Sequence, residues 1–371
     1  MSASVPPTGR NEDRKMEKFE HGGNIYRKAP HGGTWLDFSA NINPLGLAPE
    51  VSAAIAKNIA GIVHYPDPEA RQVKQAIGEH YGIACEQLIL GNGAAELFYL
   101  FLQVIRPQKV GLPVPSFSDY QRAAEAVGAE LLFSPLPAES DFAVDFARLE
   151  YELGAVDCIF LGNPNNPTGQ LLKREQLTRF LAFTESRQIW TVVDESFLDF
   201  LPADNMYSVR DLTCQYKHLF VVRSLTKFYA MPGLRLGFAS GHAALIERLE
   251  QAKDVWNVNS LAQVAGVAAL GLKEYHKMSR AFVKTEKDWL YEQLLAIRGL
   301  KPLFPSVNFI MVNVEQTGLT SSELAANMRQ QGVLVRDCAN YTGLAGRQYI
   351  RVAVRSRAEN EQMLKALEAV V

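Results

Sequence analysis

The chain lacks the features that mark several large classes of protein. Its four cysteines (Cys85, Cys158, Cys214 and Cys338) are widely scattered and form no Cys-x-x-Cys pair, which argues against a metal site and against a disulfide framework. Reduced thiols in a cytoplasmic protein are the simplest account. No segment approaches the roughly 18 consecutive apolar residues of a membrane-spanning helix. The net charge of −2 at pH 7 gives no reason to expect nucleic acid or an acidic membrane as a partner.

The composition is that of an ordinary folded protein. Apolar residues make up 47% of the 371 residues and charged residues 21%, which is typical of globular domains. A chain of this length is long for one core and predicts a large and a small lobe. Residues 1–18 are polar and contain no apolar core of a signal peptide, so we expect them to form a mobile tail.

Short apolar runs alternate with amphipathic helical stretches from about Leu88 onward, which predicts an α/β fold with a largely parallel sheet. The expected strands are 87–90, 110–114, 158–161, 190–193 and 220–222, with helices through 105 and at 118–127. Apolar residues then recur at helical spacing through most of 243–297. After Pro305 the pattern predicts strands at 308–314, 333–336 and 349–354 and helices at 321–331 and 359–370. This last part indicates a separate, smaller α+β lobe.

Polar clusters follow most of these strands, and the most informative one contains Lys227. The segment Ser224-Leu225-Thr226-Lys227 comes directly after the apolar run 218–222, and Arg235 follows eight residues after the lysine. A deprotonated lysine amine can hold an aldehyde as a Schiff base, while hydroxyls and a guanidinium can hold a phosphate. The cofactor with both groups is pyridoxal 5'-phosphate (PLP). For the lysine taken alone, a surface lysine in a strand-to-helix loop is the favoured interpretation.

Two more clusters suit the same cofactor. Small residues in 91–96 (Gly-Asn-Gly-Ala-Ala-Glu) let backbone amides at a helix start approach a phosphate. Glu96 stands where a dinucleotide fingerprint needs its third glycine, which excludes dinucleotide binding. Asp194 ends a buried strand, where a carboxylate needs a cationic partner such as a protonated pyridine nitrogen. For residues 91–96 the alternative is a plain tight turn. For Asp194 the alternative is an aspartate that caps the next helix.

The remaining candidates are a loop, an aromatic ring and two arginines. Segment 163–169 (Asn-Pro-Asn-Asn-Pro-Thr-Gly) is a rigid loop whose amides can donate to an oxygen anion, although turn chemistry alone also explains it. Phe117 can stack on a flat ring or belong to the core. Arg336 and Arg351 suit a substrate with phosphate and carboxylate groups, or form surface salt bridges. Because ligands of open α/β sheets bind at the carboxyl ends of strands, we expect these clusters to share one site.

Together these segments resemble the fold-type I PLP-dependent enzymes, the aspartate aminotransferase superfamily, from about His21 to the C-terminus. The resemblance rests on five elements in the same order: 93–95 (Gly-Ala-Ala), 166–169 (Asn-Pro-Thr-Gly), Asp194, 224–227 (Ser-x-Thr-Lys) and Arg235. It implies a large α/β domain, with a mostly parallel central sheet between helices, and a smaller α+β domain. The limits expected for this fold are an N-terminal arm at 19–55, the large PLP-binding domain at 56–285 and the small domain at 286–371.

The resemblance also implies a role for each matching residue. Lys227 would carry PLP and move protons, and Asp194 would pair with the pyridine nitrogen. Asn166 would hydrogen-bond the ring hydroxyl, and Phe117 would stack on the ring. The residues implied for the phosphate are Gly93, Ala94, Ala95, Ser224, Thr226 and Arg235. Tyr65 matches a tyrosine that reaches the cofactor phosphate of the neighbouring subunit, which implies a homodimer with shared active sites.

Within this superfamily the chain resembles the histidinol-phosphate aminotransferase branch, and four segments resemble the L-threonine-O-3-phosphate decarboxylases of cobalamin biosynthesis. The segments are 21–24, 37–46, 194–200 and 223–235. Aminotransferases commonly carry Tyr three residues after the aspartate, whereas this chain has Phe197, which the resemblance to the decarboxylases leads us to expect. The implied reaction removes CO2 from threonine phosphate and gives (R)-1-amino-2-propanol phosphate.

This reaction implies a substrate site and leaves two alternatives. His21 and Asn43 of the N-terminal arm would border the substrate, and Asn166, Arg336 and Arg351 would bind it. The first alternative is a histidinol-phosphate aminotransferase, which would break the Cα–H bond instead of the Cα–carboxylate bond. The second is a PLP-binding regulator without activity. It is disfavoured because the tail before the arm is too short for a DNA-binding module.

Overall fold

The computed structural model describes residues 21–26, 28–30 and 33–371, so the tail expected at 1–18 lies outside the described residues. Its largest element is a seven-stranded sheet with the order β2-β8-β7-β6-β5-β3-β4. The strands in this order are Leu88–Gly91, Gly237–Gly241, Leu219–Ser224, Trp190–Asp194, Cys158–Gly162, Lys109–Val114 and Glu130–Pro135. Strand β8 is antiparallel to both of its neighbours, and the other pairs are parallel. The expected α/β fold with a mostly parallel sheet is therefore confirmed.

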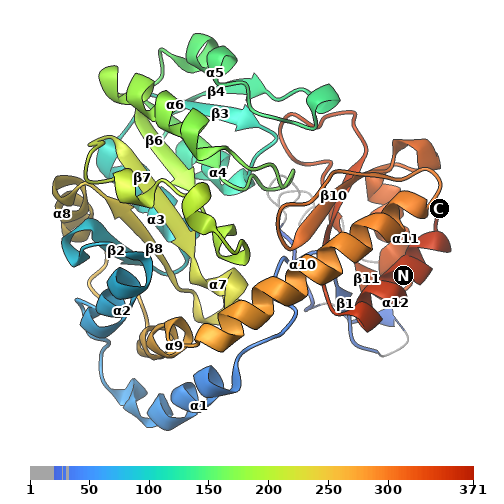
Figure 1. Ribbon diagram of the computed structural model, residues 1–371, viewed down its shortest axis with the longest axis horizontal. Helices are drawn as coiled ribbons and strands as arrows, with labels where there is room; N and C mark the ends of the chain where they lie inside the picture. Colours follow the sequence, from blue (N-terminus) through green and yellow to red (C-terminus); the bar gives the residue numbers. More distant parts are fainter. Residues whose placement is uncertain (1–20, 27, 31–32) are drawn as a thin grey trace, which may run out of the picture.

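Helices cover both faces of this sheet because successive side chains of its buried strands point to opposite sides. In β7, Phe220 and Val222 pack with α3 (Ala94–Ile105), α4 (Ser118–Ala126) and α8 (Ala243–Ala252). On the other face, Val221 packs with α5 (Phe146–Leu153) and α6 (Arg174–Ser186). The result is three layers, with the sheet in the middle (Figure 1).

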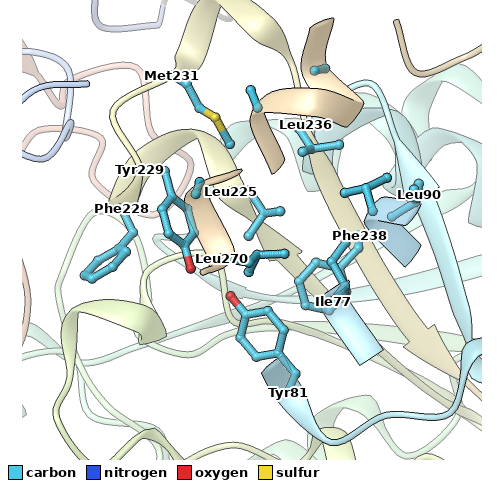
Figure 2. Close-up of a cluster of buried hydrophobic side chains, with 14 of the residues drawn as sticks. Ile77, Tyr81, Leu90, Leu225, Phe228, Tyr229, Met231, Leu236, Phe238 and Leu270 are labelled. Atoms are coloured by element: carbon cyan, nitrogen blue, oxygen red, sulfur yellow. The ribbon is translucent and has the colours of Figure 1, made fainter. Parts of the chain in front are cut away.

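A third apolar cluster supports the short helix α7 (Leu225–Phe228), which carries Lys227. Leu225 and Phe228 of α7 are buried in this cluster beside Tyr81 and Phe238 (Figure 2). The cluster also takes in residues of α1 (Pro49–Asn58), α2 (Arg71–Tyr81) and α9 (Ser260–Leu270). Because α7 has only one turn, this packing rather than helix propensity holds it in place.

The C-terminal part contains a second, antiparallel sheet with the order β12-β13-β10-β9. The strands are Arg336–Asp337, Tyr349–Ala353, Phe309–Asn313 and Lys301–Pro302, and helices α11 (Ser321–Gln330) and α12 (Arg357–Glu368) belong to the same part. A short parallel pair joins β1 (Leu36–Asp37) of the N-terminal arm to β11 (Val333–Leu334). The long helix α10 (Lys273–Ala296) runs between the two sheets (Figure 1).

The structure differs from the expected element list at a few points. The single strand expected at 333–336 is divided between β11 and β12, which belong to different sheets. Strands β4 and β8 were not expected; β8 reads Gly-Phe-Ala-Ser-Gly and lacks the apolar run that marks a buried strand. The domain limit expected at 285/286 falls inside α10, and domain limits remain a prediction. Among the described residues, no helix is long and apolar enough to cross a membrane.

Candidate active site

A cavity of about 260 Å³ opens where the carboxyl ends of the parallel strands meet the small sheet. Most of the residues predicted for the site line it, although they are spread over the whole chain. They are His21, Ala94, Ala95, Phe117, Asn166, Asp194, Ser224, Thr226, Lys227, Arg235, Arg336 and Arg351. Each strand of the large sheet that ends at the cavity contributes through the loop or helix start that follows it, as expected for an open α/β sheet.

Burial changes the protonation of the Lys227 amine. Burial, together with Arg351 and Arg235 nearby, lowers the pKa of the Lys227 amine from 10.5 to about 8. Roughly a tenth of the amine is therefore neutral at pH 7, and this form can act as a nucleophile or accept a proton. The backbone carbonyl of Lys227 accepts a hydrogen bond from the Asn43 amide at 3.0 Å, which ties α7 to the N-terminal arm.

Beside Lys227, hydroxyls and a guanidinium surround the start of α3. The Ser224 and Thr226 hydroxyls are 2.7 Å apart, and Ser224 also accepts a hydrogen bond from the Thr226 amide. An added Cβ at Gly93, where φ is +81°, would lie 2.2 Å from the Arg235 Nη2 atom. A glycine is therefore required for the guanidinium to lie beside the N-terminus of α3. Backbone amides at a helix start, two hydroxyls and a guanidinium at one place are suited to bind a phosphate.

Asp194 lies at the end of β6 and is only 8% exposed. Burial raises the pKa of its carboxyl group, while hydrogen bonds from Ser196 and Tyr120 act in the opposite direction. Among the described residues, no cationic side chain forms an ion pair with Asp194. A buried carboxylate that faces a cavity and has no ion-pair partner suits a ligand that brings its own positive charge.

Arg336 and Arg351 are direct cross-strand partners on β12 and β13, so their side chains leave the same face of the small sheet. Arg351 donates to the Ser39 carbonyl at 2.7 Å and to the Asn166 side-chain oxygen, while its Nε atom is buried without a hydrogen-bond partner. Arg336 donates to Asn340 Oδ1 at 2.8 Å and lies over the Tyr341 ring. Because like charges directly opposite each other are unfavourable, the two guanidiniums are suited to bind an anion.

Three predicted residues lie outside the cavity lining. Gly93 borders it only through its contact with Arg235. Asn43 is buried behind α7, where its Nδ2 atom donates to the Phe228 carbonyl at 2.7 Å and to the Ser279 hydroxyl at 2.8 Å; Asn41 lines the cavity instead. Tyr65 is 77% exposed and stacks on Trp256 at a centroid distance of 4.3 Å.

The structure also brings residues into the cavity that sequence reasoning missed, among them Asp119, Tyr120 and Tyr341. Asp119 Oδ1 pairs with His21 Nε2 at 3.1 Å, and the Tyr120 hydroxyl donates to Asp194 Oδ2 at 2.6 Å. Asp119 and Tyr120 could have been found from the sequence, because they lie within one helical turn after Phe117. Nothing in the sequence around Tyr341 sets it apart from other aromatic residues of the core.

Comparisons with known proteins agree with this geometry. The family described as aminotransferase class I and II matches residues 33–370. A protein of Caldanaerobacter subterraneus subsp. tengcongensis, provisionally named threonine-phosphate decarboxylase, is 37% identical over 97% of this chain and 96% of its own length. The threonine-phosphate decarboxylase of Salmonella typhimurium is 34% identical over 95% and 96%, respectively. The crystal structure of the histidinol-phosphate aminotransferase from Clostridium acetobutylicum has a TM-score of 0.83 at 28% identity and covers 90% of this chain and 98% of that one.

Proposed function

The chain belongs to the class I and II aminotransferase family of fold-type I PLP enzymes, and from this premise we propose that it decarboxylates L-threonine O-3-phosphate to (R)-1-amino-2-propanol O-2-phosphate. The two relatives above, with 37% and 34% sequence identity, are named as threonine-phosphate decarboxylases. The product would serve cobalamin biosynthesis, the pathway implied by the resemblance of residues 194–200 and 223–235.

The family uses PLP, and the residues of the cavity fit that cofactor. Ser224, Thr226, Arg235 and the start of α3 would hold its phosphate, and Lys227 would bind its aldehyde carbon. Asp194, buried without an ion-pair partner among the described residues, would pair with its ring nitrogen, while Phe117 would stack on its ring. When bound, PLP supplies an electron sink that stabilises negative charge at the substrate's Cα atom.

The observation that carries the proposed substrate is the pairing of Arg336 with Arg351 on one face of the small sheet. Threonine phosphate has two anionic groups, a phosphate and a carboxylate, and two adjacent guanidiniums suit such a molecule. His21 lies at the same cavity and adds a third group able to carry positive charge. Arg235 lies at the start of α3, so we assign Arg336, Arg351 and His21 to the substrate rather than to the cofactor phosphate.

The side chains divide the remaining work between positioning and proton transfer. Arg336 and Arg351 would fix the rotation of the substrate about its Cα atom and so decide which bond is aligned to break. Lys227, with its pKa lowered to about 8, would deliver a proton to Cα after CO2 has left. Phe197 is buried in the cavity wall against Phe309, with ring centroids 5.0 Å apart, and brings no hydroxyl group to the site.

The second candidate is a histidinol-phosphate aminotransferase, favoured by the similarity to the structure from Clostridium acetobutylicum. In that case the two arginines would bind histidinol phosphate and 2-oxoglutarate in turn. One experiment separates the candidates: the purified protein is incubated with PLP and threonine phosphate, and CO2 and aminopropanol phosphate are measured. We expect both products without any oxo acid. Turnover of histidinol phosphate that depends on 2-oxoglutarate, with no CO2 from threonine phosphate, would overturn the proposal.

A variant tests the arginine pair in the same assay. Arg336→Gln removes a charge-assisted contact to an anion, so we expect KM for threonine phosphate to rise roughly tenfold to hundredfold. Arg355→Gln is the matched control, because Arg355 belongs to the same part of the chain but pairs with Glu359 outside the cavity. An equal KM in both variants would show that Arg336 does not bind the substrate.

We also propose that the protein works as a cytoplasmic homodimer. Tyr65 and Trp256 are both exposed on the described chain and stack on each other, as expected of residues that belong to a subunit interface. The four free cysteines agree with a reducing compartment.

A further inference from the structure

Tyr120 makes the shortest contact to the Asp194 carboxylate. Its hydroxyl donates to Asp194 Oδ2 at 2.6 Å, while the Ser196 backbone amide donates to Oδ1 at 2.9 Å. Tyr120 is 1% exposed and comes from α4, 74 residues before the aspartate. The contact therefore joins the helix that follows β3 to the end of β6.

The Tyr120 ring is held on three sides by aromatic residues. It stacks on Phe160 at 5.2 Å and meets the edges of Phe98 and Phe117 at 5.2 and 5.6 Å. Phe117 is the residue expected to stack on the cofactor ring. A ring packed in this way has a single orientation, so the hydroxyl group is delivered to the carboxylate without loss of side-chain freedom on ligand binding.

Asp194 needs such a donor because its surroundings oppose its charge. Burial is the largest influence on its pKa and raises it, and the neighbouring Glu195 carboxylate acts in the same direction. Glu195 is itself bound by the buried Arg223 at 2.8 Å. Across the cavity, Lys227 is the basic residue that interacts with Asp194. Besides Lys227, hydrogen bonds from Ser196 and Tyr120 to the ionised form keep the carboxylate charged.

Tyr120 acts here as a donor and not as a second anion. Burial raises the pKa of its phenol well above the ordinary value, and the negative charge of Asp194 raises it further. The proton therefore stays on the phenol, and the pair carries one negative charge in total.

We propose that Tyr120 is a positioning residue that keeps Asp194 ionised and aimed at the cavity, so that the aspartate can pair with the protonated ring nitrogen of PLP. The inference rests on the cofactor contact proposed for Asp194 but not on the choice of substrate. Tyr120 would thus influence cofactor affinity through its hydrogen bond to Asp194.

The test measures binding of PLP to apoenzyme, by titration at several pH values followed through the visible absorbance of the bound cofactor. Tyr120→Phe removes one oxygen and keeps the ring. Loss of a hydrogen bond to a charged group should weaken PLP binding roughly tenfold to hundredfold. The pH below which affinity falls should also move up by about one to two units, because the carboxylate protonates more readily.

Tyr81→Phe is the matched control. Tyr81 is likewise buried, and its hydroxyl donates to a buried carboxylate, Asp199, at 3.1 Å, but it lies in the apolar cluster of Figure 2 and not in the cavity. Both variants should lose thermal stability, whereas only Tyr120→Phe should shift the pH profile of PLP binding. Equal affinities and equal profiles for the two variants would overturn the inference.

Asp194→Asn separates a failure of this inference from a failure of the proposed cofactor contact. If Asp194→Asn leaves PLP affinity unchanged, the contact between Asp194 and the cofactor is wrong. If it weakens binding while Tyr120→Phe does not, only the role of Tyr120 is wrong. We expect Tyr120→Phe to have little further effect in the Asp194→Asn background, since the two changes remove one shared interaction.

A second substitution covers the case in which Tyr120→Phe does not fold. Tyr120→4-aminophenylalanine keeps the ring and an N–H donor at the same place. It should shift PLP affinity in the same direction but by less, because an aromatic amine is a weaker donor than a phenol. Affinity equal to that of the unchanged protein at every pH would contradict the proposal.

Discussion

Burial of ionisable groups is the strongest influence on individual residues of this cavity. It lowers the pKa of Lys227 to about 8 and raises that of Asp194, so it pushes the base and the acid toward their neutral forms. Such opposed shifts are typical of active sites, because they place titrations near the working pH. They also make the stability of the apoenzyme depend on pH.

Lys227→Met should reveal this dependence. The Lys227 amine has a pKa near 8 in the folded chain against 10.5 as the ordinary value, so the unfolded chain binds more protons between these two pH values. The penalty for burying the charged amine is complete below pH 8 and disappears as the pH rises toward 10.5. At pH 7 the variant apoenzyme should be more stable by about 3 kcal/mol.

The measurement is denaturant unfolding of both apoenzymes from pH 7 to pH 10.5. The difference in unfolding free energy should shrink steadily above pH 8. A difference that stays constant over this range would show that Lys227 titrates at its ordinary pKa.

Gly93 is a residue where the backbone and a neighbour together exclude a side chain. Gly93→Ala would bring Cβ against the Arg235 guanidinium and also strain a φ of +81°, so we expect weaker PLP binding. Gly82→Ala is the control, because Gly82 has a φ of +68° but no atom within 4 Å of an added Cβ. Both variants lose stability, while a loss of PLP affinity is expected only for Gly93→Ala and is measured by titration of the apoenzymes.

At the scale of elements, the one-turn helix α7 is held from behind by the N-terminal arm. The Asn43 backbone amide donates to the Lys227 carbonyl, and the Asn43 side chain donates to Phe228, Ser279 and Tyr275. The side-chain amide of Asn43 already donates hydrogen bonds to these three residues. Asn43 therefore supports α7 and does not lie beside the substrate.

The variant Asn43→Ala tests whether Asn43 supports α7 or binds the substrate. The variant leaves the buried Phe228 carbonyl without this donor, so the free energy of unfolding should fall by about 1–3 kcal/mol. KM for threonine phosphate should change little, whereas Asn41→Ala, at the cavity wall, should alter KM more than stability. Thermal denaturation and steady-state kinetics of both variants check this; a large rise in KM for Asn43→Ala alone would restore its expected role in substrate binding.

The elements also show what sequence reasoning can and cannot reach. Strands β5, β6 and β7 are continuous apolar runs buried on both faces, and they were predicted for that reason. Strand β8 consists largely of small residues, and its position between β2 and β7 depends on tertiary contacts that no local pattern reports. Likewise the residues around Lys227 were found through their chemistry, whereas Tyr120 depends on a partner 74 residues away.

At the scale of the whole molecule, the cavity joins two parts of the chain. Arg351 of the small sheet donates to Asn166 of the large-domain loop, and Ser306 donates to the Gly169 carbonyl at 2.5 Å. The expected third contribution comes from a second subunit, through Tyr65.

Light scattering should give a mass about twice the 41.2 kDa of one chain. Tyr65→Ala should weaken PLP binding if its hydroxyl reaches the phosphate in the neighbouring subunit. Tyr151→Ala, at a tyrosine that is 91% exposed, should not. A monomer in solution, or equal PLP affinity for both variants, would argue against shared sites.

The order of the cavity residues along the chain has a consequence for synthesis on the ribosome. The groups expected to hold PLP within one chain lie between Gly93 and Arg235, and the large sheet is complete once β8 ends at Gly241. Arg351 follows much later, on β13, which forms the interior of the small sheet. A nascent chain therefore contains all of these cofactor groups before the ribosome has added either arginine of the pair proposed to bind the substrate.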